Sequence, residues 1–345
     1  MIIFHTPEGT FRIVKDPGYY AEPYEDDYWY LWYRFGKSKK YAVGEETRKV
    51  SLKNFYDNWP VSLRPDALLG YFRKENVTIP GHETSNFATR SLKKYRREGE
   101  KILFYGDSFV ESQAFSDDTI TAKIERKTGI DTLNYGVGGY GFDQIYLLFK
   151  ETYAQFDVHQ CIILFGLTPD DLDRLLLKVR TSPKPYYLIN NDRLVLKTEH
   201  IDKNNLESFY NSYDLPLKSY LLGLMKRKMG LSLFWDIINK EEVERKKNQI
   251  TQLILEKLSD IRYKKRLKIY FVLFYPEKDI YTEEDPHLLL KKMLKQNNFS
   301  YLDLRECLKK HITKTNLGLE NFYHGHPSSE GNEVFSDCII KYILK

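Results

Sequence analysis

The sequence lacks any long hydrophobic run. Its longest apolar stretches, residues 161–167 and 269–275, are far shorter than the roughly 20 residues that a helix needs to cross a bilayer. The N-terminus also lacks the pattern of a secretory signal, because Pro7 and Glu8 interrupt the apolar residues after Met1. We therefore expect no membrane span and predict a cytoplasmic protein.

Cysteine is scarce. Cys161, Cys307 and Cys338 are the only three in 345 residues. The number is odd, the spacings are wide and Cys161 lies inside an apolar run, so we predict buried, reduced thiols. Their spacing matches no metal site, and we expect neither a metal ion nor another cofactor.

A strong charge of one sign is also missing. Lys and Arg number 53 against 48 Asp and Glu, a net charge of +5, which does not favour nucleic acid as a partner. The basic runs 93–97 and 262–266 are predicted to be solvated surface. Contact of either run with an acidic glycan, a phosphate or a lipid headgroup remains the alternative.

Aromatic residues, by contrast, are plentiful, with 27 tyrosines. They crowd residues 19–35, inside an opening section, residues 1–98, that we treat as an aromatic-rich N-terminal extension. Such a cluster is predicted to be local core or a dimer surface, with stacking on a sugar ring as the alternative. The domain boundary is placed in the basic, polar stretch 90–99. No oligomeric state is predicted.

Residues 99–345 alternate between strands and helices, which predicts an α/β fold with a parallel sheet. The expected strands are 101–105, 132–135, 161–165, 267–275 and 301–304, and the expected helices are 120–127, 143–153, 286–297 and 333–344. Residues 175–262 interrupt the alternation. We interpret them as an insertion, with a β-hairpin at 184–196 and a long helix at 241–262, that could cover the carboxyl ends of the strands.

Four short motifs follow strands or occupy the last loop: Gly106-Asp-Ser-Phe109, Asn134–Gly141, Gly166–Asp171 and His326–Asn332. The carboxyl ends of parallel strands meet in one crevice, so we expect these motifs to converge. Acyl transfer needs a nucleophile such as Ser108 and a base such as His326, which titrates near neutral pH. It also needs preorganised N–H donors, and the glycine-rich motif exposes backbone N–H groups.

In the order and spacing of these motifs, residues 100–170 and 265–345 resemble the SGNH (GDSL-type) hydrolases, which fold as a three-layer α/β/α sandwich. The resemblance implies that Ser108 is the nucleophile and that its backbone N–H contributes to the oxyanion hole. It implies Gly139 as a second donor and His326 as the base. The family's third donor is an asparagine side chain, and its position falls on Asp170.

Two positions depart from the family pattern. An ionised Asp170 accepts hydrogen bonds and cannot donate them, so it would help an oxyanion only if burial kept it protonated. The family usually has an aspartate three residues before the histidine, where this chain has Tyr323. An orienting acid for His326 would have to come from elsewhere, with Asp171, Glu320 and Asp170 as candidates.

Other interpretations are disfavoured. We expect His324 to have no role in the reaction. A metal site formed by His324, His326 and the Asp170–Asp171 pair is supported only by the His-x-His pattern. The glycines at 136–141 do not have the spacing of a dinucleotide site.

The predicted function is that of a serine-type esterase or deacylase on O-acyl groups, such as acetyl, of a carbohydrate or glycan precursor. An O-acyltransferase using the same acyl-enzyme is the alternative. A catalytically degenerate protein that binds a glycan or another partner is the other alternative.

Overall fold

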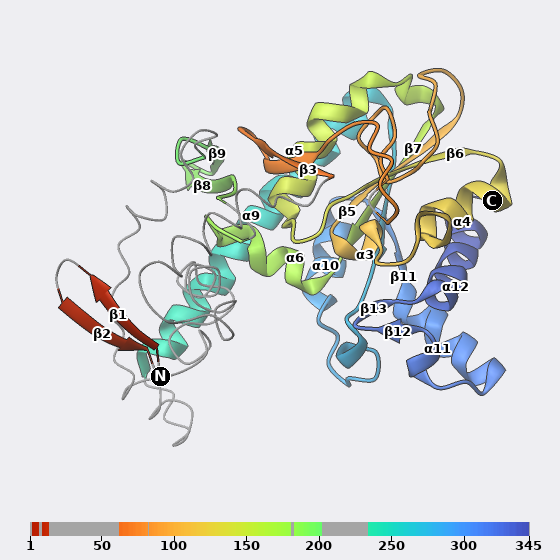
Figure 1. Cartoon of the computed structure of the whole chain (residues 1–345). Coiled ribbons are helices and arrows are strands. Elements are labelled where there is room, and N and C mark those ends of the chain that lie inside the picture. Colours follow the sequence, from red (N-terminus) through yellow and green to blue (C-terminus); the bar gives the residue numbers. More distant parts are fainter. Residues whose placement is uncertain are drawn as a thin grey trace.

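The computed structural model describes residues 2–6, 9–13, 62–81, 83–180, 183–201 and 234–344 (Figure 1). The first two ranges form an antiparallel hairpin of β1 (Ile2–Thr6) and β2 (Gly9–Ile13). The aromatic cluster at 19–35 lies outside the described residues, as does the part of the predicted insertion from 202 to 233.

A five-stranded parallel sheet forms the centre of the fold, in the order β11-β10-β7-β5-β6. Its strands are β5 (Lys101–Gly106), β6 (Asp131–Gly136), β7 (Cys161–Leu167), β10 (Lys268–Leu273) and β11 (Ser300–Asp303). These are the five strands predicted from apolar runs, and β5 is buried along its whole length. The strand order reverses between β5 and β7, which is where open α/β sheets form a ligand crevice.

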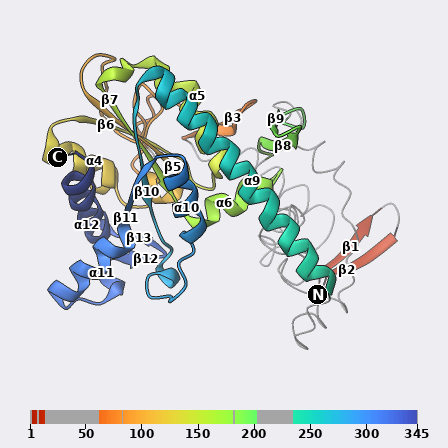
Figure 2. The ribbon, with the colours of Figure 1, turned by 180° about the vertical axis from the view of Figure 1, so that it is seen from behind.

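Helices cover both faces of the sheet (Figures 1 and 2), which confirms the predicted three-layer α/β/α sandwich. On one side lie α4 (Ile120–Thr128), α11 (Leu304–Thr315) and α12 (Ser329–Ile339). On the other lie α5 (Phe142–Thr152), α9 (Phe234–Lys265) and α10 (Leu288–Gln296). Two short helices, α3 (Ser108–Glu111) and α6 (Pro169–Asp173), follow β5 and β7 directly.

Helix ends match the capping signals in the sequence. Gly129 adopts a left-handed conformation with φ 73° and ends α4, close to the end of the helix predicted at 120–127. The Ser328 side chain accepts a hydrogen bond from Gly331 N–H and caps α12, which continues into a π-helical turn at Ile340–Leu344.

The described parts of the predicted insertion contain the expected hairpin, formed by β8 (Tyr186–Asn190) and β9 (Arg193–Lys197). Asn191 and Asp192 at its turn both have positive φ, 48° and 56°, as a two-residue hairpin loop requires. The expected helix at 241–262 lies within α9, whose apolar side buries Ile250, Ile254 and Leu258.

Residues 62–81 and 83–98 pack into the same core. They contribute the antiparallel pair β3 (Leu63–Asp66) and β4 (Gly70–Arg73), and the side chains of Tyr71, Phe72 and Tyr95 belong to the buried cluster around the sheet. The domain boundary near residue 98 stays a prediction.

The expectation that all three cysteines are reduced is wrong for two of them. Cys307 and Cys338 form a disulfide, while Cys161 is a free, buried thiol. The two bonded cysteines lie on α11 and α12, whose packing brings their Cα atoms to 6.4 Å. Their separation of 31 residues gave no hint of this proximity. Disulfides of this kind persist mainly in oxidising compartments, so the pairing lends no support to the cytoplasmic prediction.

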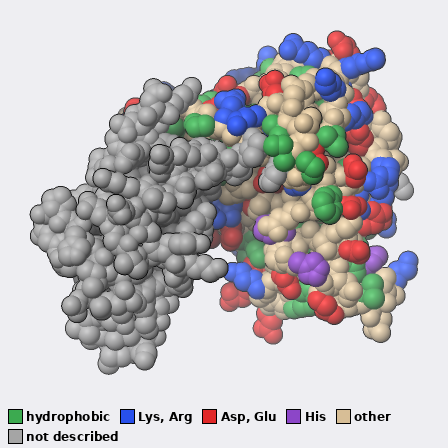
Figure 3. Space-filling view, viewed as in Figure 1, with side chains coloured by type: hydrophobic (Ala, Val, Ile, Leu, Met, Phe, Trp, Pro, Cys, Tyr) green, Lys and Arg blue, Asp and Glu red, His purple; other side chains and the backbone are tan. Residues whose placement is uncertain are grey.

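Acidic and basic side chains intermingle over the face of the described residues that Figure 3 shows, in keeping with the small net charge. No helix in the described ranges is both long and apolar enough to cross a membrane.

Candidate active site

Ser108 is the first residue of α3, directly after β5. The chain packs closely at this turn. A Cβ at Gly106 would lie only 2.8 Å from the Gly166 carbonyl oxygen on the neighbouring strand, so a side chain there would clash. Asp107 is the N-cap, and its Oδ1 accepts the Phe109 N–H at 2.8 Å. Ser108 therefore stands at the carboxyl end of β5, beside the point where the strand order reverses.

His326 reaches Ser108 from the far end of the chain. It begins β13 (His326–Pro327), which pairs with β12 (Tyr323–His324), and its Nε2 lies 2.9 Å from the Ser108 Oγ. The imidazole also packs against Phe109, with ring centroids 4.9 Å apart. Residues that are 218 positions apart in sequence are thus within hydrogen-bond reach, as a nucleophile and its base need to be.

The pKa of His326 is lowered from its ordinary value, chiefly because burial disfavours the charged imidazolium. The negative charges of Asp107 and Glu111 oppose this shift, and Arg174 adds to it. The two carboxylates that favour a protonated His326 therefore belong to the turn and helix of the nucleophile.

No carboxylate in the described ranges hydrogen-bonds to His326. Tyr323, at the position of the family's aspartate, is buried and donates its hydroxyl to the Tyr275 carbonyl. The candidate Glu320 lies on the exposed short helix Leu319–Asn321, and Asp171 is engaged elsewhere. His324 is exposed beside the hairpin turn. The role of orienting acid for Asp171 or Glu320 stays a prediction.

Two backbone N–H groups at the site are free to donate. Ser108 N–H is at the first position of α3, where no intrahelical acceptor exists. Gly139 has φ 82° and makes no backbone hydrogen bond through its N–H within the described residues. The preceding Gly138 adjoins the nucleophile, because a Cβ there would lie 3.7 Å from the Ser108 Cβ. These two groups suit the oxyanion hole expected from Ser108 and Gly139.

The Asp170 side chain is not buried. Its side chain is 56% exposed and lies 3.6 Å from the Arg174 guanidinium. The burial on which a donating Asp170 depended is absent. Its contribution to the oxyanion hole stays a prediction that this geometry does not favour.

A buried charged cluster beneath the nucleophile is not apparent from the sequence. Arg174 Nη1 lies 3.2 Å from Asp107 Oδ2 and 2.8 Å from Asp171 Oδ1, and it also donates to the Tyr140 carbonyl. Burial and the nearby Asp107 charge raise the pKa of Asp171, which Arg174 opposes. The ion pair with Arg174 holds Asp107 against the end of α6. Because Asp107 is the N-cap of α3, the cluster also holds the start of α3.

A second feature missed from the sequence is the contact between Glu111 and Arg73, 2.8 Å apart. Ser108 and Glu111 match the Ser-x-x-Glu pattern of a capping box, which would turn the Glu111 carboxylate back toward the helix start. Because Asp107 is the N-cap instead, the Glu111 side chain is available for other contacts.

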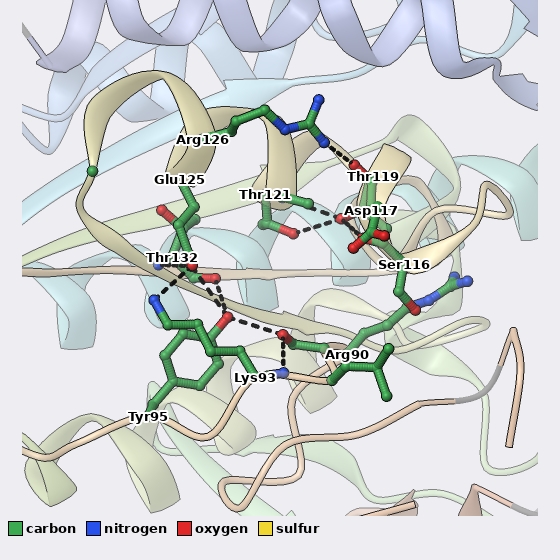
Figure 4. A pocket seen from close by; sticks show the side chains of 14 residues that line it. Arg90, Lys93, Tyr95, Ser116, Asp117, Thr119, Thr121, Glu125, Arg126 and Thr132 are labelled. Carbon is green, nitrogen blue, oxygen red and sulfur yellow. Dashed lines mark hydrogen bonds and ion pairs between the residues drawn. The ribbon is translucent and has the colours of Figure 1, made fainter. Parts of the chain in front are cut away.

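A cavity of about 570 Å³ lies apart from this site, between residues 90–95 and α4 (Figure 4). Neither Ser108 nor His326 lines it. Its basic residue Lys93 is paired with Glu125 and Asp131, at 2.8 and 2.6 Å. The predicted basic run 93–97 therefore offers less free positive charge than its sequence indicates. In the described part of the chain, no group of three or more His, Cys, Asp or Glu side chains is arranged to hold a metal ion.

No family model and no curated sequence matches the chain. Among solved structures it is similar to an acetyl xylan esterase, at 12% identity and a TM-score of 0.40, over 70% of this chain and 99% of the other. It is also similar to a mutant of an acetylxylan esterase from Geobacillus stearothermophilus, at 12% identity and a TM-score of 0.38, over 71% and 95%. A two-domain esterase active on acetylated mannans is matched at 10% identity and a TM-score of 0.38, over 72% of this chain and 49% of the other.

Proposed function

We propose that the protein is a serine esterase or deacylase that forms an acyl-enzyme on Ser108. The observation that carries the proposal is the 2.9 Å contact between Ser108 Oγ and His326 Nε2, at the carboxyl end of a parallel sheet. Among the described residues, the backbone N–H groups of Ser108 and Gly139 have no acceptor, and Gly138 adjoins the Ser108 side chain. A nucleophile, a base and an oxyanion hole are the parts that acyl transfer requires.

In the proposed reaction, Ser108 Oγ attacks the ester carbonyl carbon while its proton passes to His326 Nε2. The carbonyl oxygen becomes an oxyanion that the N–H groups of Ser108 and Gly139 stabilise. The ester C–O bond then breaks, and the leaving alkoxide takes the proton from His326. Water, deprotonated by His326, attacks the acyl-enzyme, and the acid leaves as Ser108 regains its proton.

The proposed substrate is an O-acyl group, such as acetyl, on a carbohydrate or glycan precursor. This choice rests on the resemblance of the four motifs to the SGNH hydrolases. In an O-acyltransferase, a sugar hydroxyl would replace water in the second step, and everything up to the acyl-enzyme would be the same. The two outcomes differ only in which acceptor the second half-reaction admits.

Hydrolysis of p-nitrophenyl acetate tests the proposal. We expect p-nitrophenol release by the wild type and its loss, to the background rate, in Ser108→Ala. The exposed Ser300→Ala, on β11, serves as the matched control and should keep the wild-type rate. Equal rates in wild type and Ser108→Ala would overturn the proposal, and no release at any pH would favour the degenerate, glycan- or partner-binding protein.

Acceptor competition separates hydrolysis from transfer. With an acetylated oligosaccharide as donor and a free oligosaccharide in excess, mass spectrometry reports whether the acyl group appears as acetate or on the acceptor. Acetate as the main product indicates an esterase, whereas a labelled acceptor that depends on Ser108 indicates an acyltransferase.

A further inference from the structure

The geometry points to Glu111 as a positioning residue for the reaction at Ser108. Held by Arg73, it fixes the Gly138–Gly139 turn of the oxyanion hole, and its negative charge stabilises the imidazolium that His326 becomes during the reaction. This inference rests on the proposed function and deepens it. It gives residues 62–98 a part in the active site and names a carboxylate that acts on the charge of His326 without a hydrogen bond to it.

Glu111 contacts the glycine turn directly. It lies one helical turn after Ser108, and its Oε2 accepts the Gly138 N–H at 2.6 Å. A Cβ at Gly138 would lie 2.7 Å from that Oε2, so glycine is what allows the carboxylate to approach. With Gly138 N–H engaged, the next N–H along the chain, that of Gly139, is the one left free for an oxyanion.

Strand β4 holds both partners of this contact. Arg73, whose side chain is only 2% exposed, donates to Glu111 Oε1 at 2.8 Å, and its other nitrogen is 3.4 Å from the Asn134 carbonyl. Two residues earlier, the Tyr71 hydroxyl donates to the Gly138 carbonyl at 2.5 Å. Gly138 is therefore held at its N–H by Glu111 and at its C=O by Tyr71.

Arg90 supports the helix from the other end. Its guanidinium donates to the backbone carbonyls of Glu111, Ser112 and Ala114, so the last turn of α3 is also fixed by the chain before residue 98. These contacts hold the backbone that carries the Glu111 side chain.

The charge of Glu111 bears on the base as well as on the turn. The charged groups that act on His326 are Asp107 and Glu111, which favour its protonated form, and Arg174, which opposes it. Asp107 is already paired with Arg174, at 3.2 Å. Those acting on Glu111 are Arg73 and Arg90. Removing the Glu111 charge should therefore lower the pKa of His326 and weaken the stabilisation of the imidazolium in the transition state.

The test compares Glu111→Gln, which removes the charge, with Glu111→Asp, which keeps the charge but shortens the reach to Gly138. Both kcat and the pH dependence of kcat/KM are measured with p-nitrophenyl acetate. The exposed Glu242, which pairs with Arg245 on α9, gives the matched control Glu242→Gln. NMR titration of the His326 ring in each protein supplies a readout that needs no turnover.

In Glu111→Gln we expect kcat to fall about tenfold or more. This loss should be smaller than the roughly 10²- to 10³-fold loss in kcat that follows removal of an entire oxyanion-hole donor. The acid limb of kcat/KM and the NMR-measured pKa of His326 should both move to lower values. In Glu111→Asp the limb should stay near that of the wild type while kcat falls, and the Gly138 amide proton should move upfield as its hydrogen bond weakens. Glu242→Gln should change none of these quantities.

An unchanged His326 pKa together with an unchanged kcat in folded Glu111→Gln would overturn the inference about Glu111. The proposed function would still stand in that case if Ser108→Ala lost activity. A fall in kcat equal in both variants, with no shift of the His326 pKa, would also overturn it, because it would reduce Glu111 to a structural residue. Failure of the proposed function alone would show as full activity in Ser108→Ala.

Discussion

The Tyr323 hydroxyl donates to the Tyr275 carbonyl at 3.0 Å, inside the core and three residues before His326 in the chain. Burial raises the pKa of Tyr323 well above its ordinary value, so the phenol stays neutral and serves as a hydrogen-bond donor. Tyr323 thus anchors the histidine loop to the chain just after β10 and supplies no charge to the base.

Replacing Tyr323 with Phe should therefore affect stability more than catalysis. The substitution removes the donor to the Tyr275 carbonyl and leaves the ring in place, so we expect the free energy of unfolding to fall by about 1–2 kcal/mol. Urea unfolding measures this change. The kcat with p-nitrophenyl acetate should stay within about twofold of the wild type. A loss of kcat by orders of magnitude would instead show that Tyr323 acts on His326.

The lowered pKa of His326 predicts how activity depends on pH. His326 accepts a proton only when neutral, and its pKa lies below the usual value of about 6.5 because the ring is buried. The rate constant kcat/KM should therefore hold constant as pH falls through 6.5 and decline only at lower pH. An acid limb above pH 6.5 in the wild type would contradict the account.

The lowered pKa of His326 also makes the free energy of unfolding depend on pH. The unfolded chain, with His326 at its ordinary pKa, binds the proton before the folded protein does. The free energy of unfolding should therefore decrease as pH falls from about 6.5 toward the folded-state pKa. This contribution should be missing in His326→Gln, and denaturation curves of the two proteins between pH 7 and pH 5 measure the difference.

The Asp107–Arg174–Asp171 cluster should control the position of the nucleophile. Arg174→Lys keeps the charge but loses the guanidinium that reaches both carboxylates, at 3.2 and 2.8 Å, so the N-cap of α3 is less firmly held. We expect kcat to fall by about 10-fold or more, since small misplacements of a reacting group can slow reactions by up to about 10². The exposed Arg245→Lys, which tests the same substitution on α9, should leave kcat unchanged. Equal kcat values in Arg174→Lys and Arg245→Lys would contradict the claim that Arg174 positions Ser108.

The buried pair of Asp143 and Lys184 should matter for folding. The two side chains have no exposed surface and lie 2.5 Å apart, and Lys184 also donates to three backbone carbonyls. Lys184→Met would leave Asp143 unpaired in the core, with an expected loss of about 3–5 kcal/mol at neutral pH. Because burial already raises the pKa of Asp143, the variant should recover stability as pH falls and the carboxyl group becomes protonated.

A double variant provides the control for that prediction. Asp143→Asn combined with Lys184→Met removes both charges and should restore part of the lost stability and flatten its pH dependence. Urea unfolding at pH 5 and pH 8 distinguishes the variants. Equal stability of the wild type and Lys184→Met at both pH values would contradict the prediction.

Much of the fold was predictable because its signals are local. The apolar runs of β5, β7 and β10 identify buried strands, and Gly129 marks the end of α4 without any knowledge of its neighbours. The proximity of Ser108 and His326 was predictable because the first follows a strand and the second lies in the loop before the final helix, and the sheet topology brings such positions together.

The remaining features depend on contacts between residues far apart in the chain. Glu111 has the spacing of a capping residue, and only the packing of β4 shows that it pairs with Arg73. The disulfide between Cys307 and Cys338 likewise follows from the packing of two helices. For Asp170, the sequence places the residue after β7 but does not determine that its side chain is exposed.

The central claim is that Ser108 is a nucleophile activated by His326, and covalent labelling with a fluorophosphonate tests it most directly. Intact-mass and peptide analysis should find one phosphonyl group, attached to Ser108. The label should be absent in Ser108→Ala and should form much more slowly in His326→Gln. A wild-type protein that remains unlabelled, or carries the label on another residue, would contradict the account.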